Sequence, residues 1–459
     1  MDGYTWSGNS RLNKLTSWSN NSMQDVPSEV IYLEDEDDNS KWSICLNPMP
    51  DNEDYNITYG FGYAKYNHIS NGINQNLTVF VPRNDSIKIN LLTLKNLFPK
   101  KRKLKIIYYL KQTMGEDEVK TNRFIDLKLK ENSNILLARN VISSDFNGIM
   151  YVSGSEKIDS FSGDKKYFFG KGTINNPDGL KYMNLNSENS LGKDSCIAVK
   201  FEIELEAYEN KEICLMLGEE KSILNCQDIA YKYSNINYCK EELNKVKKYW
   251  EDLIENVQVK TPLESTNIIL NGWSIYQTIS SRLLARTAFY QSGGAYGFRD
   301  QLQDTLACKY IDSEIMKNQI IKASKHQFIE GDVEHWWHEE TSRGIRTRFS
   351  DDLLWLTYVT ADYVKFTNDY SILDLETCYR NGNRLEDGVD ERYDLYEESD
   401  VKETVYNHCI RAIEKSLDFG ENGLPKIGSG DWNDGLSTVG NKGKGESIWL
   451  RLLLIFCYF

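Results

Sequence analysis

A glycine-rich segment over residues 428–435 (GSGDWNDG) carries the carboxylates best suited to acid chemistry. It places Asp431 and Asp434 on either side of Trp432. A carboxyl group set between an aromatic ring and glycines is a good candidate for a raised pKa, which suits a general acid. An EF-hand is excluded, because the Asp spacing and the Glu at position 12 do not match. The segment therefore indicates a candidate acid, and a plain Asx turn is the alternative.

A second charged segment places three arginines, Arg343, Arg346 and Arg348, just before Asp351 and Asp352. A guanidinium group suits a bidentate oxyanion such as phosphate, and a carboxylate binds sugar hydroxyls by charge-assisted hydrogen bonds. The alternative is a solvated loop whose charges pair with one another. From these residues alone, both interpretations stay open.

Three of the five histidines, His326, His335 and His338, fall within 13 residues. A metal site is the first hypothesis for such a cluster. However, His335 and His338 do not have HExxH spacing, and no helix is predicted around them. We therefore predict no metal here.

A third segment, residues 291–304 (QSGGAYGFRDQLQD), leads from glycines into a predicted helix. Its glycines allow close backbone approach, and its polar residues, among them Arg299, stand at the start of that helix. The segment lacks the Gly-Lys-Ser/Thr sequence of a phosphate-binding loop, and no βαβ unit surrounds it. A nucleotide cofactor is therefore not expected.

The elements that must position these residues change in type near residue 239. From about residue 30 to 235, short alternating apolar runs are separated by turn-forming residues, which predicts antiparallel strands and a β-sandwich. Runs of this kind lie at 77–81, 87–91, 104–110 and 196–203. From Cys239 to Glu255 the apolar residues recur at helical spacing.

Longer helical patterns follow and are separated by loops rich in glycine and charge. They lie at Thr266–Thr287, Asp300–Lys325, Asp351–Thr367, Val401–Phe419 and Glu446–Phe459. We therefore predict a β-sandwich domain over residues 1–238, a helical linker over 239–261 and an all-α domain over 262–459. The alternation of helices with long loops fits a helical toroid.

Composition excludes several classes of function. The 459 residues include 54 Lys and Arg against 68 Asp and Glu, a net charge of −14, which disfavours binding to nucleic acid. The nine cysteines form no CxxC pair, which indicates reduced thiols. No secretory signal is visible, and the longest apolar run, Ile448–Phe459, is interrupted by Arg451 and too short to cross a bilayer. We expect a cytoplasmic protein that does not contact membranes.

The three segments occur in order and together closely resemble glycoside hydrolase family 94. Residues 3–35 and 60–96 resemble its β-1,2-glucan branch, which includes 1,2-β-oligoglucan phosphorylases and the C-terminal region of cyclic β-1,2-glucan synthases. The resemblance implies an N-terminal β-sandwich, a helical linker and an (α/α)6 barrel whose loops form the site. It also implies inverting phosphorolysis of a β-linked glucan, with inorganic phosphate as co-substrate and neither metal nor cofactor.

The resemblance also implies roles for individual residues. Asp434 would protonate the glycosidic oxygen, and no base is needed because phosphate itself is the nucleophile. Trp432 would wall the donor sugar site, and Arg343 or Arg348 would help to position phosphate. The other residues implied to bind substrate are Arg299, His335, Trp336, Arg346 and Asp352.

The main departure from the family is length. Its members continue for several hundred residues, and residues 262–459 supply roughly half of the helices of the barrel. We therefore expect a C-terminally truncated chain that holds a partial (α/α)6 barrel. Two alternatives to a phosphorylase remain, a non-catalytic glycan-binding remnant and an inverting hydrolase. The expected partners are an oligosaccharide and phosphate, and a homodimer is a further expectation.

Overall fold

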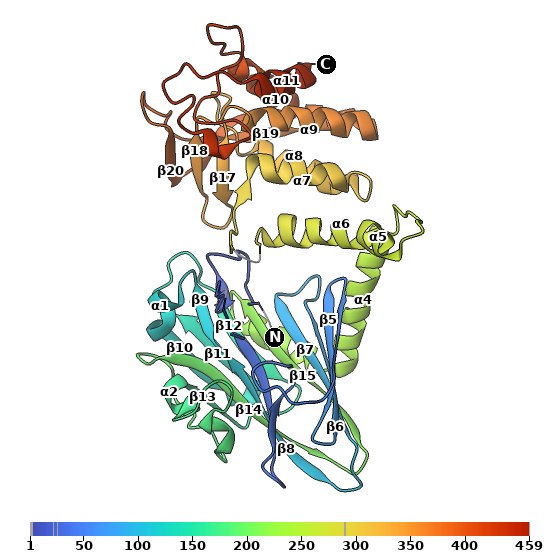
Figure 1. The fold of residues 1–459 in the computed structure, drawn as a ribbon. Coiled ribbons are helices and arrows are strands. Elements are labelled where there is room, and N and C mark those ends of the chain that lie inside the picture. The colour runs from blue at the N-terminus through green and yellow to red at the C-terminus, as the bar shows by residue number, and fades with distance from the viewer. Residues whose placement is uncertain (1–2, 22, 25, 289–290, 459) are drawn as a thin grey trace. The chain divides into compact units, whose positions relative to one another are not determined.

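A computed structural model describes residues 3–21, 23–24, 26–288 and 291–458 (Figure 1). The chain divides into two compact units. One unit runs to Asp252 and includes a short piece that ends at Ser292; the other contains Leu253–Ala288 and the residues from Gly293 onward. None of the described helices combines the length and apolar character needed to cross a membrane.

The first unit is a sandwich of two antiparallel sheets, as the sequence predicts (Figure 1). Within the described residues the larger sheet has eight strands and the smaller has five. In spatial order, the larger contains β10 (Ile125–Lys130), β11 (Ile135–Asn140), β12 (Ile149–Gly154), β15 (Asn210–Glu220), β7 (Ile87–Asn96), β6 (Ile73–Phe80), β5 (Tyr63–Ser70) and β4 (Tyr55–Gly60). The smaller contains β13 (Ser160–Asp164), β14 (Ser195–Leu205), β8 (Arg102–Leu110), β2 (Glu29–Asp35) and β3 (Lys41–Ser43). A separate pair joins β1 (Lys14–Thr16) to β9 (Gln112–Gly115).

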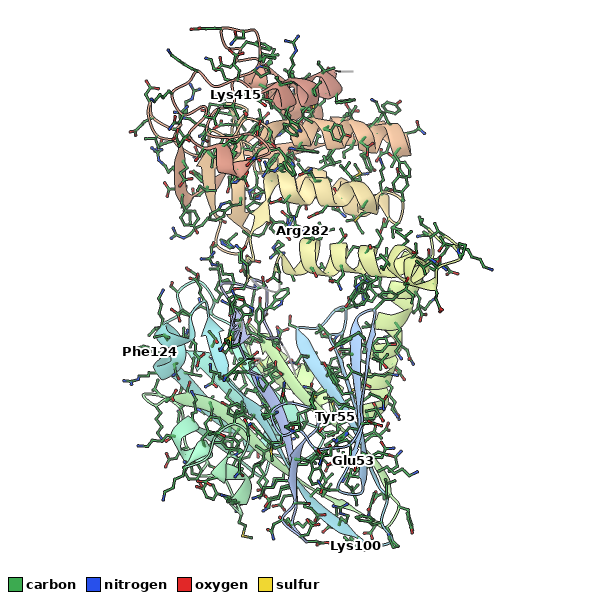
Figure 2. All side chains as sticks on the ribbon, viewed as in Figure 1. Glu53, Tyr55, Lys100, Phe124, Arg282 and Lys415 are labelled. Atoms are coloured by element: carbon green, nitrogen blue, oxygen red, sulfur yellow. The ribbon has the colours of Figure 1, made fainter. Side chains whose placement is uncertain are left out.

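Alternation along the strands builds the core of the sandwich. Val199 and Phe201 of β14 lie opposite Tyr108 and Ile106 of β8, and all four side chains are buried between the sheets. The other face of the smaller sheet packs against α2 (Lys165–Phe169), where Phe168 is buried. Side chains fill the space between the two sheets, as Figure 2 shows.

Two helices follow β15, namely α3 (Ile223–Tyr233) and α4 (Ile236–Ile254), while the short α1 (Glu118–Thr121) comes earlier, after β9. The sequence predicts a helix over 239–255, and α4 confirms it. The apolar face of α4 covers Gly62, where an added Cβ would collide with Val246 and Trp250. Gly62 has a φ of +79°, so the turn that receives α4 requires glycine on both counts.

The second unit is mainly helical. Its helices are α5 (Glu264–Ile268), α6 (Ser274–Gln277), α7 (Phe298–Cys308), α8 (Ser313–Ser324), α9 (Asp352–Thr367), α10 (Val405–Ser416) and α11 (Ile448–Tyr458). Two π-helical stretches, Ile269–Trp273 and Thr278–Ala285, flank α6. The core of this unit surrounds α9, which contacts α7, α8, α10 and α11.

Two predicted helices differ in extent from the observed ones. The pattern over 300–325 is two helices, because the Asp312 side chain accepts the Glu314 N–H and starts α8 as a new helix. Likewise α10 begins at Val405, four residues later than predicted, because the Thr404 hydroxyl caps it by accepting the Asn407 N–H. The residues before it form a strand.

The prediction of an all-α second half is wrong in one respect, because this unit also contains two small sheets. The first joins β16 (Tyr296–Gly297), β17 (Glu334–His338), β18 (Arg343–Thr347) and β20 (Glu391–Leu395), and the second joins β19 (Glu376–Asn381) to β21 (Glu397–Thr404). The charged segment predicted as a loop is therefore a β-hairpin. Trp337 is buried in the helical core and Trp336 is partly exposed, which is the alternation of a strand.

Candidate active site

The glycine-rich loop before α11 holds its two aspartates in different environments. Asp431 is buried; one of its oxygens accepts the Ser447 hydroxyl at 2.7 Å and the other accepts the Asn433 N–H at 3.0 Å. Asp434 opens a single 3₁₀ turn, and its side chain is 56% exposed. Asp431 therefore holds the loop together, and Asp434 is the carboxylate that a ligand in solution can reach.

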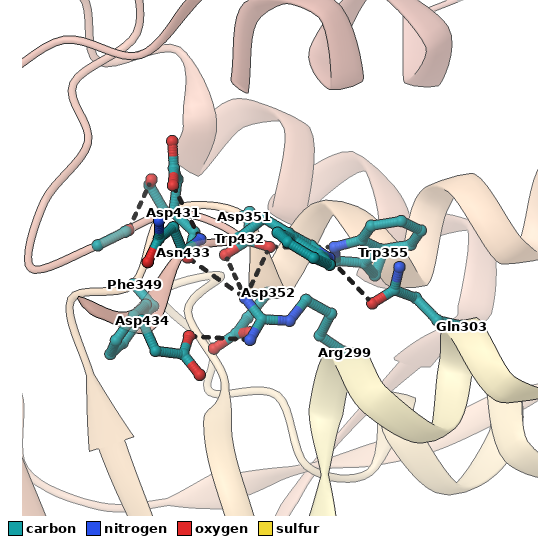
Figure 3. A network of polar contacts seen from close by, with 12 residues as sticks. Arg299, Gln303, Phe349, Asp351, Asp352, Trp355, Asp431, Trp432, Asn433 and Asp434 are labelled. Atoms are coloured by element: carbon teal, nitrogen blue, oxygen red, sulfur yellow. Dashed lines mark hydrogen bonds and ion pairs between the residues drawn. The ribbon is translucent and has the colours of Figure 1, made fainter. Parts of the chain in front are cut away.

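Arg299 joins the exposed aspartate to a buried one (Figure 3). It lies in the first turn of α7, and its Nη2 donates to Asp434 Oδ1 at 2.8 Å. Its Nη1 lies 3.1 Å from Asp351 Oδ2 and 3.3 Å from the main-chain oxygen of Asp431. Asp351 also accepts the Trp355 Nε1–H at 3.1 Å. One guanidinium group thus links α7, the start of α9 and the glycine-rich loop.

Asp351 is the most perturbed acid of this group. Burial raises its pKa to about 7, the neighbouring charge of Asp352 adds to the rise, and Arg299 opposes it. Its carboxylate is fully buried and does not cap α9, because both oxygens face Arg299. We attribute a structural role to Asp351, since a substrate cannot reach it.

Asp352 and His335 form the second contact of the site. His335 Nδ1 lies 2.7 Å from Asp352 Oδ2, and the imidazole stacks on Phe349 with ring centroids 4.5 Å apart. Burial lowers the pKa of His335, but the Asp352 carboxylate outweighs burial, so the net shift is upward. Asp352 Oδ1 is buried and has no hydrogen-bond partner among the described residues. The predicted contact of Asp352 with a sugar hydroxyl stays a prediction.

Trp432 gives the site an aromatic surface. Its side chain is exposed beside Asp434, and its Nε1–H points to Gln303 Oε1 of α7 at 3.4 Å. A flat ring with a fixed polar edge is well suited to pack against a sugar.

Arg346 belongs to a different network. Its Nε and Nη2 donate to Asp332 at 2.6 Å each, Nη2 also donates to Glu330 at 3.0 Å, and Nη1 donates to the carbonyls of Gly382 and Asn383. The guanidinium group also lies over the Phe328 ring at 3.8 Å. Every N–H of Arg346 is therefore engaged, and its predicted contact with sugar stays a prediction.

The three arginines of the hairpin do not converge. Arg343 and Arg346 are three residues apart on β18, so their side chains leave opposite faces of the strand. Arg343 is exposed and shares its face with Trp336, which packs against Tyr393 at 5.4 Å. Arg348 donates to carbonyls of the 385–389 segment. Their predicted roles with phosphate stay predictions.

A cavity of about 600 Å³ lies next to this hairpin. Arg346, Arg348 and Phe349 line it, together with acidic residues such as Asp332 and Asp390. Phe349 also carries the stacked imidazole of His335, so one ring borders both the cavity and the site of Asp434.

The three clustered histidines have separate partners. His326 contacts Glu334 at 3.0 Å and stacks on Trp337 at 3.8 Å, whereas His335 contacts Asp352. His338 packs edge-on against Trp336, with ring centroids 5.7 Å apart. Across the part of the chain that the structure describes, no group of three or more His, Cys, Asp or Glu side chains is arranged to hold a metal ion.

Sequence reasoning missed Glu334 and Phe349, and it named Asp351 without giving it a role of its own. Glu334 is buried beside Arg380 at 3.0 Å, and burial raises its pKa to about 8. An acid inside an apolar strand pattern was the available signal for Glu334, and adjacency to Asp352 was the signal for Asp351. Nothing in the sequence marks Phe349 as a shared wall.

Comparisons with known proteins agree with this architecture. The family model described as "Glycosyl hydrolase 94, supersandwich domain" matches residues 2–236. The family model described as "Glycosyl hydrolase 94 superfamily, catalytic domain" matches residues 249–458. These matches confirm the predicted sheet-rich N-terminal domain followed by a helical one.

Among curated relatives, the cyclic β-(1,2)-glucan synthase NdvB of Rhizobium meliloti (strain 1021) is 31% identical over 98% of this chain and 16% of its own length. The N,N'-diacetylchitobiose phosphorylase of Vibrio furnissii is 24% identical over 98% of this chain and 58% of its own. The solabiose phosphorylase of Paenibacillus borealis is 24% identical over 93% and 53%. The chain thus spans less than two thirds of each of these relatives. On the match of both domains, with the sandwich alone covering half of the sequence, the chain belongs to glycoside hydrolase family 94.

Proposed function

We propose that this chain acts in the inverting phosphorolysis of a β-linked glucan, and in its reversal, with Asp434 as the general acid. A phosphate oxygen forms a bond to the anomeric carbon while the bond from that carbon to the glycosidic oxygen breaks. Asp434 gives its proton to the departing oxygen, and the product is a sugar 1-phosphate of inverted configuration. In the reverse direction the ionised Asp434 takes the proton of the acceptor hydroxyl.

The observation that carries this proposal is the exposed Asp434 carboxylate with one oxygen fixed by Arg299. Preorganised charge of this kind is the main source of catalytic power in polar active sites. Trp432 beside it supports a sugar site. Contact of Asp352 with a sugar hydroxyl stays a prediction.

Burial of the neighbouring acids favours phosphorolysis over hydrolysis. An inverting hydrolase needs a second carboxylate that activates a water molecule. Asp351 and Asp352 are both buried, and their contacts are to Arg299 and His335. Neither is placed to deprotonate a water from solvent, whereas phosphate needs no base. Arg343 or Arg348 is the proposed phosphate contact, and no metal or organic cofactor is part of the proposal.

The proposed substrate is a β-1,2-linked glucan. The 31% identical relative is named a cyclic β-(1,2)-glucan synthase, and the other two relatives are named as phosphorylases. All nine cysteines are free thiols, which supports a reducing, cytoplasmic compartment. The predicted homodimer stays a prediction.

The proposal is tested by offering the protein glucose disaccharides linked β-1,2, β-1,3 or β-1,4, each with and without inorganic phosphate. We expect glucose 1-phosphate only when phosphate is present, and fastest from the β-1,2 disaccharide. Release of reducing sugar without phosphate would identify a hydrolase. Binding of the disaccharide without turnover would identify a non-catalytic glycan-binding protein.

A further inference from the structure

Arg299 lies between a fully buried acid, which anchors it, and an acid that solvent can reach. Its anchor is Asp351, which is fully buried at the start of α9 and is itself held by the Trp355 indole. Its other partner is Asp434, on a loop without regular structure apart from one 3₁₀ turn. The guanidinium group therefore ties the exposed Asp434 side chain to a buried acid of the helical core.

The loop of Asp434 is attached to the same frame at two more points. Arg299 Nη1 reaches the carbonyl of Asp431 at 3.3 Å, and Asp431 accepts the hydroxyl of Ser447 just before α11. Arg299 thus contacts both the main chain of this loop, at Asp431, and one of its side chains, Asp434. Because Oδ1 of Asp434 already accepts a hydrogen bond from Arg299, Oδ2 is the oxygen that exchanges a proton with the substrate.

We propose, on the basis of the function proposed above, that Arg299 is the positioning residue of Asp434, with Asp351 as its anchor. The sequence predicted that Arg299 binds substrate. That substrate contact stays a prediction. In the structure Arg299 is almost wholly buried, and its Nη groups donate to Asp351, to the Asp431 carbonyl and to Asp434. It acts through Asp434, and it fixes the orientation of the carboxylate that exchanges the proton.

Two variants separate positioning from folding. Arg299→Lys keeps the charge but replaces the planar fork with a point charge that cannot bond Asp351 and Asp434 through two fixed nitrogens. The double variant Arg299→Gln/Asp351→Asn removes the cation together with its buried anion, so that no charge is left uncompensated in the core. Arg282→Gln is the matched control, because Arg282 is half-exposed and pairs with Asp304 outside the site.

We expect Arg299→Lys to lower kcat at least about 10-fold, because small misplacements of a catalytic group are costly. KM for the disaccharide should change by less than about threefold, since Arg299 does not touch the sugar. In the double variant kcat should fall at least as far, with the same small change in KM. The control should match the wild-type protein. A double variant that keeps the wild-type kcat would overturn the proposal, even with Asp434→Asn inactive.

A readout without turnover keeps this proposal separate from the proposed function. The carboxyl carbon of Asp434 is observed by NMR at a single neutral pH in protein labelled with 13C-aspartate, and the signal is assigned by its loss in Asp434→Asn. We expect its chemical shift to change in Arg299→Lys and in the double variant but not in Arg282→Gln, because the contact of Oδ1 with a fixed guanidinium nitrogen is lost. An unchanged chemical shift in both Arg299 variants would overturn the role of Arg299, whether or not the wild-type protein turns over a glucan.

Discussion

Arg299 and Arg346 are both buried arginines of the helical unit, yet their surroundings differ. Arg346 donates every N–H to Asp332, Glu330 and two main-chain carbonyls, which lie just before β17 and just after β19. Arg299 has a fully buried partner on one side, Asp351, and the exposed Asp434 on the other.

The difference shows that burial of an arginine does not by itself define its role. An enclosed arginine whose partners are partly buried acids and main-chain carbonyls ties chain segments together, and its loss lowers stability. An arginine with one solvent-exposed partner orients a side chain that can react, and loss of that side chain lowers activity. Arg346 therefore links β18 to the segments before β17 and after β19, whereas Arg299 holds the exposed carboxylate of Asp434.

The largest expected effect is on the exposed side of this comparison. Asp434→Asn removes the transferable proton and keeps the shape, so phosphorolysis should fall by about 10²–10⁴-fold. The reverse reaction should fall in parallel, because the same group acts there as base. The free energy of unfolding should change by less than about 1 kcal/mol, since the pair with Arg299 is half in solvent. Initial rates in both directions and urea unfolding measure these effects.

Two neighbouring aspartates are the controls for that experiment. Asp300→Asn alters an exposed acid one residue after Arg299 and should leave the rate unchanged. Asp431→Asn weakens the hydrogen bonds that hold the loop and should reduce the rate clearly less than Asp434→Asn. If Asp431→Asn abolishes turnover and Asp434→Asn does not, the acid has been assigned to the wrong carboxylate.

The next effect belongs to the enclosed arginine. Arg346→Met leaves Glu330 and Asp332 without their shared cation, which should cost about 3 kcal/mol or more in the free energy of unfolding. Arg384→Met is the matched control, because Arg384 also pairs with Glu330 but is largely exposed, and its loss should cost less than about 1 kcal/mol. Equal losses in the two variants would contradict the distinction between an enclosed and an exposed arginine.

The smallest effect concerns Glu334, which lies opposite Arg346 in the hairpin. Because burial raises its pKa to about 8, the folded protein holds a proton there that the unfolded chain releases near pH 4.5. Its contribution to stability is therefore complete below about pH 4.5 and is lost as pH rises through about 8. Glu334→Gln, which stays neutral, should flatten this decline by up to about 1.4 kcal/mol per pH unit between pH 5.5 and 7.5.

Urea unfolding at pH 5.5, 6.5 and 7.5 measures that slope. Glu403→Gln is the control, since the hydrogen bond from Arg411 lowers the pKa of Glu403 to about 2 and its contribution to stability changes only at lower pH. A slope that is the same in wild-type protein and Glu334→Gln would show that Glu334 stays ionised in the fold.

Much of the fold could be predicted, because its strands and helices follow short-range patterns of apolar residues. Alternation marked the strands around 104–110 and 196–203, and helical spacing marked α4 and α9. The hairpin of β17 and β18 was missed because its strands have five residues each and are dense in charge. Had 343–347 been interpreted as a strand, the odd and even positions would have placed Arg343 and Arg346 on opposite faces.

The site was predictable in its residue types and not in its contacts. The sequence placed Asp431 and Asp434 in one turn, but only the fold shows which of them is buried. The partner of Asp434 lies 135 residues away, on a helix whose first turn carries no mark of that contact. Long-range pairing of this kind depends on how helices pack, which short sequence patterns do not encode.

Phe349 has a consequence for how this site can change. Its ring lines the cavity, supports the imidazole of His335 and presses against Gly430, where an added Cβ would collide with it. The size of the cavity and the orientation of the His335 imidazole therefore depend on the same side chain. A shorter side chain at this position would widen the cavity and, in the same step, remove the ring on which His335 stacks. A change that admits a bulkier ligand would therefore have to begin at another residue of the cavity wall.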